Sequence, residues 1–171
     1  MKKFLYIMVG FAILLLVLYT YLGGFTAPEV TVKASEEMYV AGIPFKGSLE
    51  DEKFGNAFRR AAEVLDNGEL DGTLGNIYYN DPERGDSIDA FVGLIISDTT
   101  VALPEGYELR VIPAKKKVLH AEANANVALL PKKLYTAVFD YAKENNLKLE
   151  TFYVEWFPEE DKGVVEVPVK E

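Results

Sequence analysis

The residues best suited to chemistry lie in one short stretch near the carboxyl end. Glu155 is flanked at two-residue spacing by Tyr153 and Phe157. If the stretch is a strand, these three side chains share one face, because successive side chains alternate between faces. A carboxylate between aromatic rings can hold a cation, and burial would raise its pKa to suit a general acid. From spacing alone, a solvent-exposed strand glutamate explains the pattern slightly better.

A second aromatic pair, Tyr78 and Tyr79, precedes an Asn-Asp-Pro sequence that we interpret as a turn. Adjacent strand residues point to opposite faces, so we expect one tyrosine to line a cleft and the other to be core. Trp156 alternates with Glu155, and we expect its ring to pack under a helix.

Other chemistry is sparse. The sequence has one histidine, His120, and no cysteine, so thiolate chemistry is excluded and one histidine cannot build a metal site. We expect His120 to be a structural or surface residue, and we expect no metal or cofactor. No nucleophile-elbow or phosphate-loop sequence is present. The sequence favours a binding protein over an enzyme, and a hydrolase would depend on Glu155 with a hydroxyl group.

The charge balance limits the classes of partner that this protein can bind. There are 18 basic and 27 acidic residues, which gives a net charge of −9. Such a chain is repelled by phosphate backbones, so we expect no nucleic acid partner. Aromatic residues make up 12% of the chain, which suits a pocket for flat molecules but equally suits a well-filled core.

The amino-terminal segment carries no charged side chain from Phe4 to Pro28. About 20 apolar helical residues cross a hydrocarbon core of about 30 Å. Lys2 and Lys3 precede the span, which predicts an amino terminus in the cytoplasm. We therefore predict a transmembrane anchor over 1–27 and an extracytoplasmic domain over 28–171. The alternative is a cleaved signal peptide, which Pro28 disfavours because it directly follows the best cleavage site.

The elements that must position the candidate residues repeat along the chain. Helical periodicity and stop signals predict helices near 50–67 and 127–145. A strand precedes each helix and two strands follow it, at 38–45, 74–79, 88–96, 117–123, 149–157 and 164–169, with an extra strand at 107–112. Both halves therefore have the predicted element order strand, helix, strand, strand.

This pattern predicts an α+β fold built by duplication. The tyrosines before Asp81-Pro82 align with the aromatic stretch before Pro158, each in the strand after a helix. Two such units should pair about a pseudo-twofold axis into one antiparallel sheet assembly with two helices and a central cleft. In this alignment Tyr79 and Glu155 are equivalent and should face the same cleft.

Four motifs in this order resemble the GyrI-like, or AraC-type, bacterial effector-binding domain. They are Gly75-Asn76-Ile77-Tyr78-Tyr79-Asn80-Asp81-Pro82, Tyr107-Glu108-Leu109-Arg110-Val111-Ile112-Pro113, Phe152-Tyr153-Val154-Glu155-Trp156-Phe157 and Val165-Glu166-Val167-Pro168-Val169. The resemblance implies a duplicated α+β domain that holds hydrophobic, often cationic, aromatic compounds. It also implies that Glu155 faces the ligand and that Tyr79 matches the family's first-half tyrosine. The chain departs from the family at His120-Ala121-Glu122, where a glycine-containing turn is usual.

The function expected from these observations is a membrane-anchored domain that senses or sequesters a small molecule. The expected ligand-binding residues are Glu155, Tyr79, Tyr153, Phe157 and Tyr78. Two alternatives stay open: a hydrolase of reactive small molecules that uses Glu155, and a tethered envelope protein that binds another protein.

Overall fold

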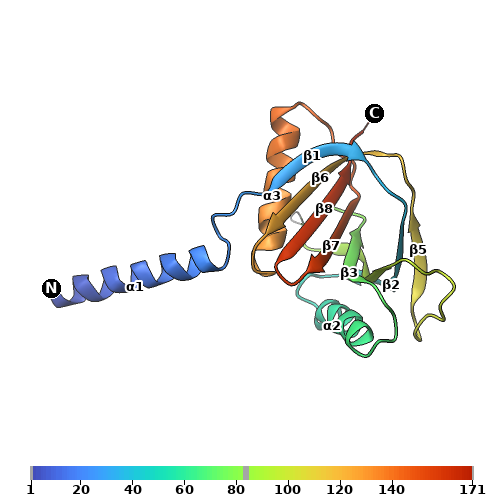
Figure 1. Cartoon of the computed structure of the whole chain (residues 1–171), viewed down its shortest axis with the longest axis horizontal. Coiled ribbons are helices and arrows are strands. Elements are labelled where there is room, and N and C mark those ends of the chain that lie inside the picture. Colours follow the sequence, from blue (N-terminus) through green and yellow to red (C-terminus); the bar gives the residue numbers. More distant parts are fainter. Residues whose placement is uncertain (1, 83–84, 171) are drawn as a thin grey trace.

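The computed structural model describes residues 2–82 and 85–170. Helix α1 (Lys2–Tyr21) projects from a domain in which two helices, α2 (Glu52–Asp66) and α3 (Leu130–Glu144), pack on a curved sheet (Figure 1). The strands are β1 (Glu29–Ala34), β2 (Met38–Gly47), β3 (Thr73–Tyr78), β4 (Ile88–Ile96), β5 (Glu108–Ile112), β6 (Lys117–Asn124), β7 (Tyr153–Glu159) and β8 (Lys162–Pro168).

The strand order shows the duplication directly. The sheet runs β1-β6-β8-β7-β3-β4-β2-β5, and every neighbouring pair is antiparallel. Four pairs of strands are equivalent: β2 with β6, β3 with β7, β4 with β8 and β5 with β1. When the two members of every pair are exchanged, the same strand order is obtained in reverse. The pseudo-twofold axis therefore passes between β3 and β7, and the predicted duplicated α+β fold is confirmed.

The two outermost strands are exchanged between the halves. β1 leads into β2 but pairs with β6, whereas β5 leads into β6 but pairs with β2. The sequence pattern did not predict β1. Five of its six residues are exposed, so it lacks the alternation of apolar and polar residues that marks a half-buried strand. The predicted strand from 149 begins only at Tyr153, after an isolated bridge between Leu149 and Val169.

Both domain helices cover the same face of the sheet. One core cluster joins Ala57 of α2 and Leu134 of α3 to Ala90, Leu119 and Val165 of the sheet. Asp51 caps the start of α2, because its side chain accepts a hydrogen bond from the Lys53 amide at 2.9 Å. We call the face of the sheet that α2 and α3 cover the helix face, and we call the opposite face the second face.

A row of glycines crosses the sheet on its second face. Gly42 of β2 pairs with Gly93 of β4, which in turn pairs with Gly75 of β3. A Cβ atom on Gly93 would lie 2.0 Å from the Ala41 carbonyl oxygen, so the backbones approach more closely here than any side chain allows. The row lets the strands bend sharply, which gives the sheet its curvature.

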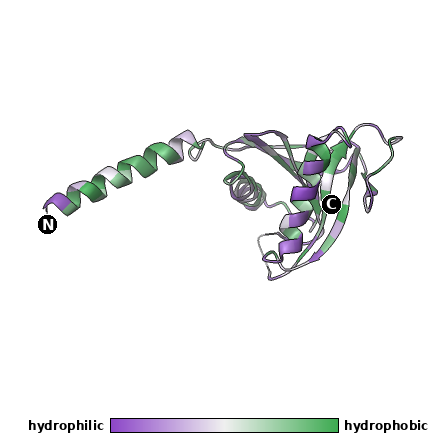
Figure 2. Ribbon diagram, turned by 90° about the horizontal axis from the view of Figure 1, so that it is seen from below, coloured by the Kyte–Doolittle hydropathy of each residue, from purple (hydrophilic) through white to green (hydrophobic). Residues whose placement is uncertain are grey.

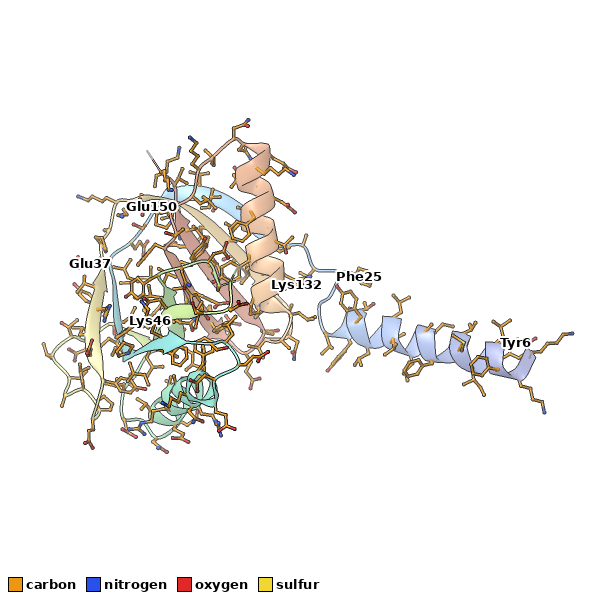
Figure 3. The ribbon with its side chains drawn as sticks, turned by 180° about the vertical axis from the view of Figure 1, so that it is seen from behind. Tyr6, Phe25, Glu37, Lys46, Lys132 and Glu150 are labelled. Carbon is orange, nitrogen blue, oxygen red and sulfur yellow. The ribbon has the colours of Figure 1, made fainter. Side chains whose placement is uncertain are left out.

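Helix α1 is apolar along most of its length, and its residues from Lys2 to Tyr21 are all exposed (Figure 2). It is long and apolar enough to cross a membrane, and a signal sequence has the same character. Its end is joined to the domain by the Asn126 amide, which donates to the Leu22 carbonyl at 3.0 Å, and by Lys133 Nζ, which donates to the Gly24 carbonyl at 2.7 Å. Phe25 and Lys132 lie at this junction (Figure 3).

Candidate functional site

The strands on either side of the pseudo-twofold axis bring a carboxylate and an amide together. β3 and β7 pair so that Asn76 lies directly opposite Glu155, with Tyr78 opposite Tyr153 two residues along. All four side chains lie on the helix face, because positions two apart in a strand share a side. The Asn76 amide Nδ2 donates to Glu155 Oε2 at 2.9 Å. Glu155 is only 3% exposed, so the acid lies inside the protein.

Burial controls the protonation of this acid. Desolvation raises the pKa of Glu155 from 4.5 to about 7, although the Asn76 amide and the Tyr78 hydroxyl both act to lower it. The second carboxyl oxygen, Oε1, is buried without a hydrogen-bond partner in the described part of the chain. Burial and the neighbouring Glu155 raise the pKa of Tyr78 well above its usual value, so its hydroxyl stays protonated. The site therefore has an unpartnered acceptor on an acid that ionises near neutral pH.

Aromatic rings share the helix face with the acid. Tyr135 of α3 packs on Tyr153 with ring centroids 5.8 Å apart. Phe54 of α2 lies 4.8 Å from Phe45 of β2 and 5.0 Å from Phe58. Tyr135 and Tyr153 belong to the core cluster that includes Tyr78, and the three phenylalanines pack against it. The negative faces of aromatic rings favour a positive charge among them.

A cavity of about 610 Å³ lies beside this cluster, between α2 and the strands β3 and β7. We call it the helix-face cavity. Its lining includes Phe58 of α2, Phe157 of β7 and Asn76, the residue that holds Glu155. Asn76 thus links the cavity to the buried acid. The volume suits a drug-sized ligand, because small-molecule sites enclose about 300–1,000 Å³.

Four of the five expected site residues lie on the helix face, and Tyr79 does not. Glu155, Tyr78 and Tyr153 lie together, and Phe157 lines the adjacent cavity. Tyr79 points to the second face, where its hydroxyl accepts a hydrogen bond from Arg110 at 2.9 Å. The expectation that Tyr79 and Glu155 face one cleft is therefore wrong. The alignment of the two halves was out of register by an odd number of residues, which reverses the face of a strand residue.

Trp156 and His120 also lie on the second face. Trp156 was expected under a helix, but it packs with Val154 of the second-face core and lies 6.1 Å from the His120 ring. His120 Nδ1 is 2.9 Å from Glu166, which also pairs with Lys33 at 3.0 Å. His120 is therefore a structural residue, as expected. Within 2–82 and 85–170, no cluster of side chains could hold a metal ion.

Asn76 is a polar member of the site that the sequence pattern did not single out. It is a buried amide in the middle of β3, between apolar and glycine neighbours. A polar side chain inside an apolar strand is a recognisable signal, because a buried amide needs a partner. Its partner, Glu155, is 79 residues away and is identified only by the register of the sheet.

The fold and site define an α+β domain built from two exchanged halves, with an acid buried beneath the helix face at their junction. Residues 28–163 match the family described as the GyrI-like small molecule binding domain. The chain belongs to this family, as the sequence motifs indicated. Among curated proteins, a sequence search finds no match.

Solved structures share the fold at low sequence identity. An integron cassette protein from Vibrio cholerae superposes with a TM-score of 0.62 at 15% identity, covering 85% of this chain and 99% of its own. SAV2435 bound to tetraphenylphosphonium superposes with a TM-score of 0.58 at 13% identity, covering 83% of this chain and 94% of its own. A hydrolase from Listeria innocua superposes with a TM-score of 0.51 at 12% identity, covering 89% of this chain and 98% of its own.

Proposed function

We propose that this protein is a membrane-tethered receptor for a hydrophobic organic cation, with Glu155 as the charge partner. The observation that carries this proposal is the buried carboxyl group, which has one unpartnered oxygen and lies on the same sheet face as Tyr78 and Tyr153. An isolated charge is costly to bury, and a cation in contact with it offsets that cost. The complex of SAV2435 with tetraphenylphosphonium, a lipophilic aromatic cation, supports this choice of ligand.

The cavity and the acid would contact different parts of the ligand. Phe58 and Phe157 supply apolar surface in the helix-face cavity, and Tyr78 and Tyr153 lie around the acid. The ligand's rings would occupy the cavity, with its positive centre toward Asn76 and Glu155. A bound cation favours the ionised carboxylate, so binding below pH 7 would release a proton. Affinity would therefore be weaker at pH 6 than at pH 8.

Glu155→Gln is expected to weaken binding of tetraphenylphosphonium about 10- to 100-fold, since it removes a desolvated charge partner worth about 1–3 kcal/mol. The neutral triphenylphosphine oxide should lose less than about threefold. Calorimetric titration of the full chain in nanodiscs, with empty nanodiscs subtracted, measures both. Glu160→Gln is the matched control, because Glu160 lines the same cavity but is exposed. Equal losses for both ligands would contradict the proposal.

A hydrolase is the second candidate, and the pKa of Glu155 is the observation that favours it. An acid with a pKa of about 7 can give and take protons near neutral pH, and the Tyr78 hydroxyl lies beside it. The Listeria innocua hydrolase shows that this fold occurs in an enzyme. Turnover of a small ester that disappears in both Glu155→Gln and Tyr78→Phe would favour this function over simple binding.

We also propose that α1 holds the domain outside the cytoplasm, with Lys2 and Lys3 inside. The chain has no cysteine, so Glu105→Cys, at an exposed position, gives a single labelling site. A membrane-impermeant maleimide is expected to label this variant in intact cells. The same cells opened by detergent provide the control for reactivity. Labelling that appears only after the membrane is opened would reverse the proposed orientation, and recovery of a free soluble domain would indicate cleavage instead.

A further inference from the structure

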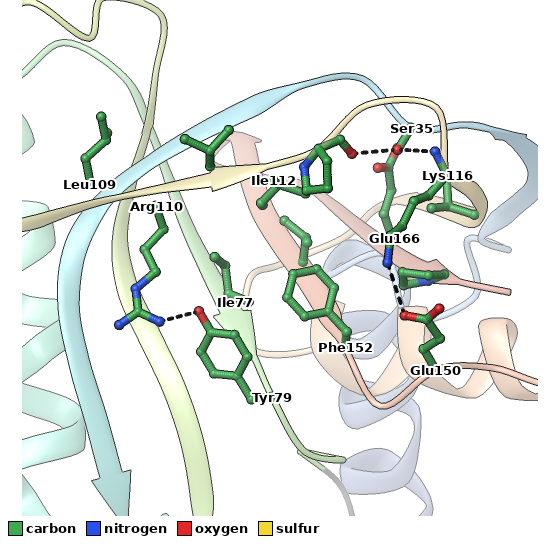
Figure 4. Close-up of a pocket in the computed structure, with 15 residues that line it drawn as sticks. Ser35, Ile77, Tyr79, Leu109, Arg110, Ile112, Lys116, Glu150, Phe152 and Glu166 are labelled. Carbon is green, nitrogen blue, oxygen red and sulfur yellow. Dashed lines mark hydrogen bonds and ion pairs between the residues drawn. The ribbon is translucent and has the colours of Figure 1, made fainter. Parts of the chain in front are cut away.

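A second cavity, of about 480 Å³, lies on the other side of the strands that carry Glu155 (Figure 4). We call it the second-face cavity. Ile77 of β3 and Val154 of β7 line it, and Phe152 lies beside them. Ile77 and Val154 are direct neighbours in the sheet, one residue from Asn76 and Glu155. The two cavities therefore lie on opposite faces of the same two strands.

Two linkers, β1–β2 and β5–β6, line one end of the second-face cavity. Ser35, between β1 and β2, is buried and accepts a hydrogen bond from the Lys116 amide at 3.1 Å. Its hydroxyl donates to the Pro113 carbonyl at 3.1 Å, within the β5–β6 connection (Figure 4). Both exchanged strands are therefore tied together over the curved sheet. These contacts make the cavity a part of the fold rather than a chance gap at its surface.

Arg110 of β5 brings a positive charge to this cavity. Its guanidinium lies 4.6 Å above the Phe91 ring and 5.7 Å from the Tyr79 ring. Nη1 donates to the Tyr79 hydroxyl at 2.9 Å, and Nη2 forms an ion pair at 3.4 Å with Glu108, an exposed residue that does not line the cavity. The aromatic side chains hold the cation in place without cancelling its charge. A guanidinium held in this way can still donate to an incoming carboxylate.

The acids that line the cavity are already paired. Glu166 is neutralised by Lys33 at 3.0 Å and hydrogen-bonded to His120 at 2.9 Å. Glu150 pairs with Lys116 at 3.5 Å, at the opposite end from Arg110 (Figure 4). At its other end the cavity presents Arg110 next to an apolar floor, and the carboxylate paired with Arg110, that of Glu108, is exposed to solvent and does not line the cavity.

We infer that the second-face cavity is a second ligand site, which takes an amphipathic organic anion. The apolar body of the ligand lies on Ile77, Phe152 and Val154, and its carboxylate or sulfonate group meets Arg110. The helix-face site, with its buried acid, would prefer the opposite charge. The two faces of the same central strands thus differ in the sign of the charge that they accept. This inference is independent of the proposed cation site.

The matched ligands 2-naphthoate and 2-naphthamide test the inference, because they differ chiefly in charge. Calorimetry on the full chain in zwitterionic nanodiscs should show at least tenfold tighter binding of naphthoate. Arg110→Met should remove that preference while leaving naphthamide within about threefold, and Arg110→Lys should retain part of it. Leu109→Glu, which places a negative charge on a partly exposed lining residue, should also weaken naphthoate alone.

Two further variants separate this site from the helix-face cavity. Arg59 lines the helix-face cavity and is exposed, so Arg59→Met should leave naphthoate binding unchanged. Glu160→Gln, at another exposed residue that lines the helix-face cavity, should also leave it unchanged. Thermal unfolding of each variant establishes that it is folded. Absence of a charge preference in the wild type, an unchanged affinity in both Arg110→Met and Leu109→Glu, or a loss in Arg59→Met instead would overturn the inference.

Discussion

At pH 8.5, Glu155→Gln is expected to make the ligand-free protein about 2–3 kcal/mol more stable than the wild type. Burial raises the pKa of Glu155 from 4.5 to about 7, and the difference corresponds to about 3 kcal/mol. Below pH 4.5 the acid is neutral in both folded and unfolded chains. As the pH rises through 7 the folded protein must bury the charge, so the wild type loses stability that the amide retains.

Urea unfolding at pH 5 and pH 8.5 measures this difference. Trp156 is the single tryptophan and neighbours Glu155, so its fluorescence reports the unfolding of β7. The advantage of the variant should shrink to less than about 1 kcal/mol at pH 5. An advantage that does not change with pH would mean that Glu155 is not buried as an acid with a raised pKa.

Glu166→Gln provides the control with the opposite sign. Burial acts to raise the pKa of Glu166, but the hydrogen bonds from His120 and Lys33 outweigh it and hold the pKa below its usual value. The ionised form of Glu166 therefore stabilises the fold above its unfolded-state pKa, and that stability is lost as the pH falls through the folded-state pKa. The same substitution at this position should destabilise the protein at pH 8.5.

Gly93→Ala is expected to cost at least about 3 kcal/mol, in the upper part of the range for single substitutions. The added methyl group would lie 2.0 Å from the Ala41 carbonyl oxygen and 2.5 Å from the Gly42 Cα atom. Both neighbours are backbone atoms of β2, so the clash is relieved only by separating the two strands. Chemical unfolding at neutral pH measures the loss.

Gly55→Ala makes the same chemical change where there is room. Gly55 lies in helix α2, and a Cβ atom there would meet nothing within 4 Å. Alanine favours a helix interior over glycine, so this variant should gain up to about 1 kcal/mol. If the two variants had similar stabilities, the close approach of β2 and β4 would not limit the curvature of the sheet.

The helices and most strands could be predicted because their burial is periodic. In α3, for example, Leu130, Leu134 and Val138 recur at helical spacing and are fully buried. β1 could not be predicted in this way, because it is an edge strand whose side chains are mostly exposed. Its place beside β6 depends on the tertiary fold and leaves no periodic trace in the sequence.

The candidate site was partly accessible from the sequence. Glu155 and its flanking residues could be chosen because alternation along one strand needs no knowledge of its neighbours. Tyr79 was misplaced because comparing the halves required the register between them, and a one-residue error moves a side chain to the other face. Arg110 and Tyr79 meet across 31 residues on different strands, so only the folded chain brings them together.

The exchange of β1 and β5 determines where this protein can be divided. A cut between β4 and β5 separates two sequence repeats but leaves β1 with the wrong partner, since β1 completes the edge beside β6. The same cut strips β2 of β5. A chimaera with a relative would therefore have to transplant β1 together with β6, α3, β7 and β8. The segment that repeats in the sequence and the segment that folds together in the sheet are therefore different pieces of chain.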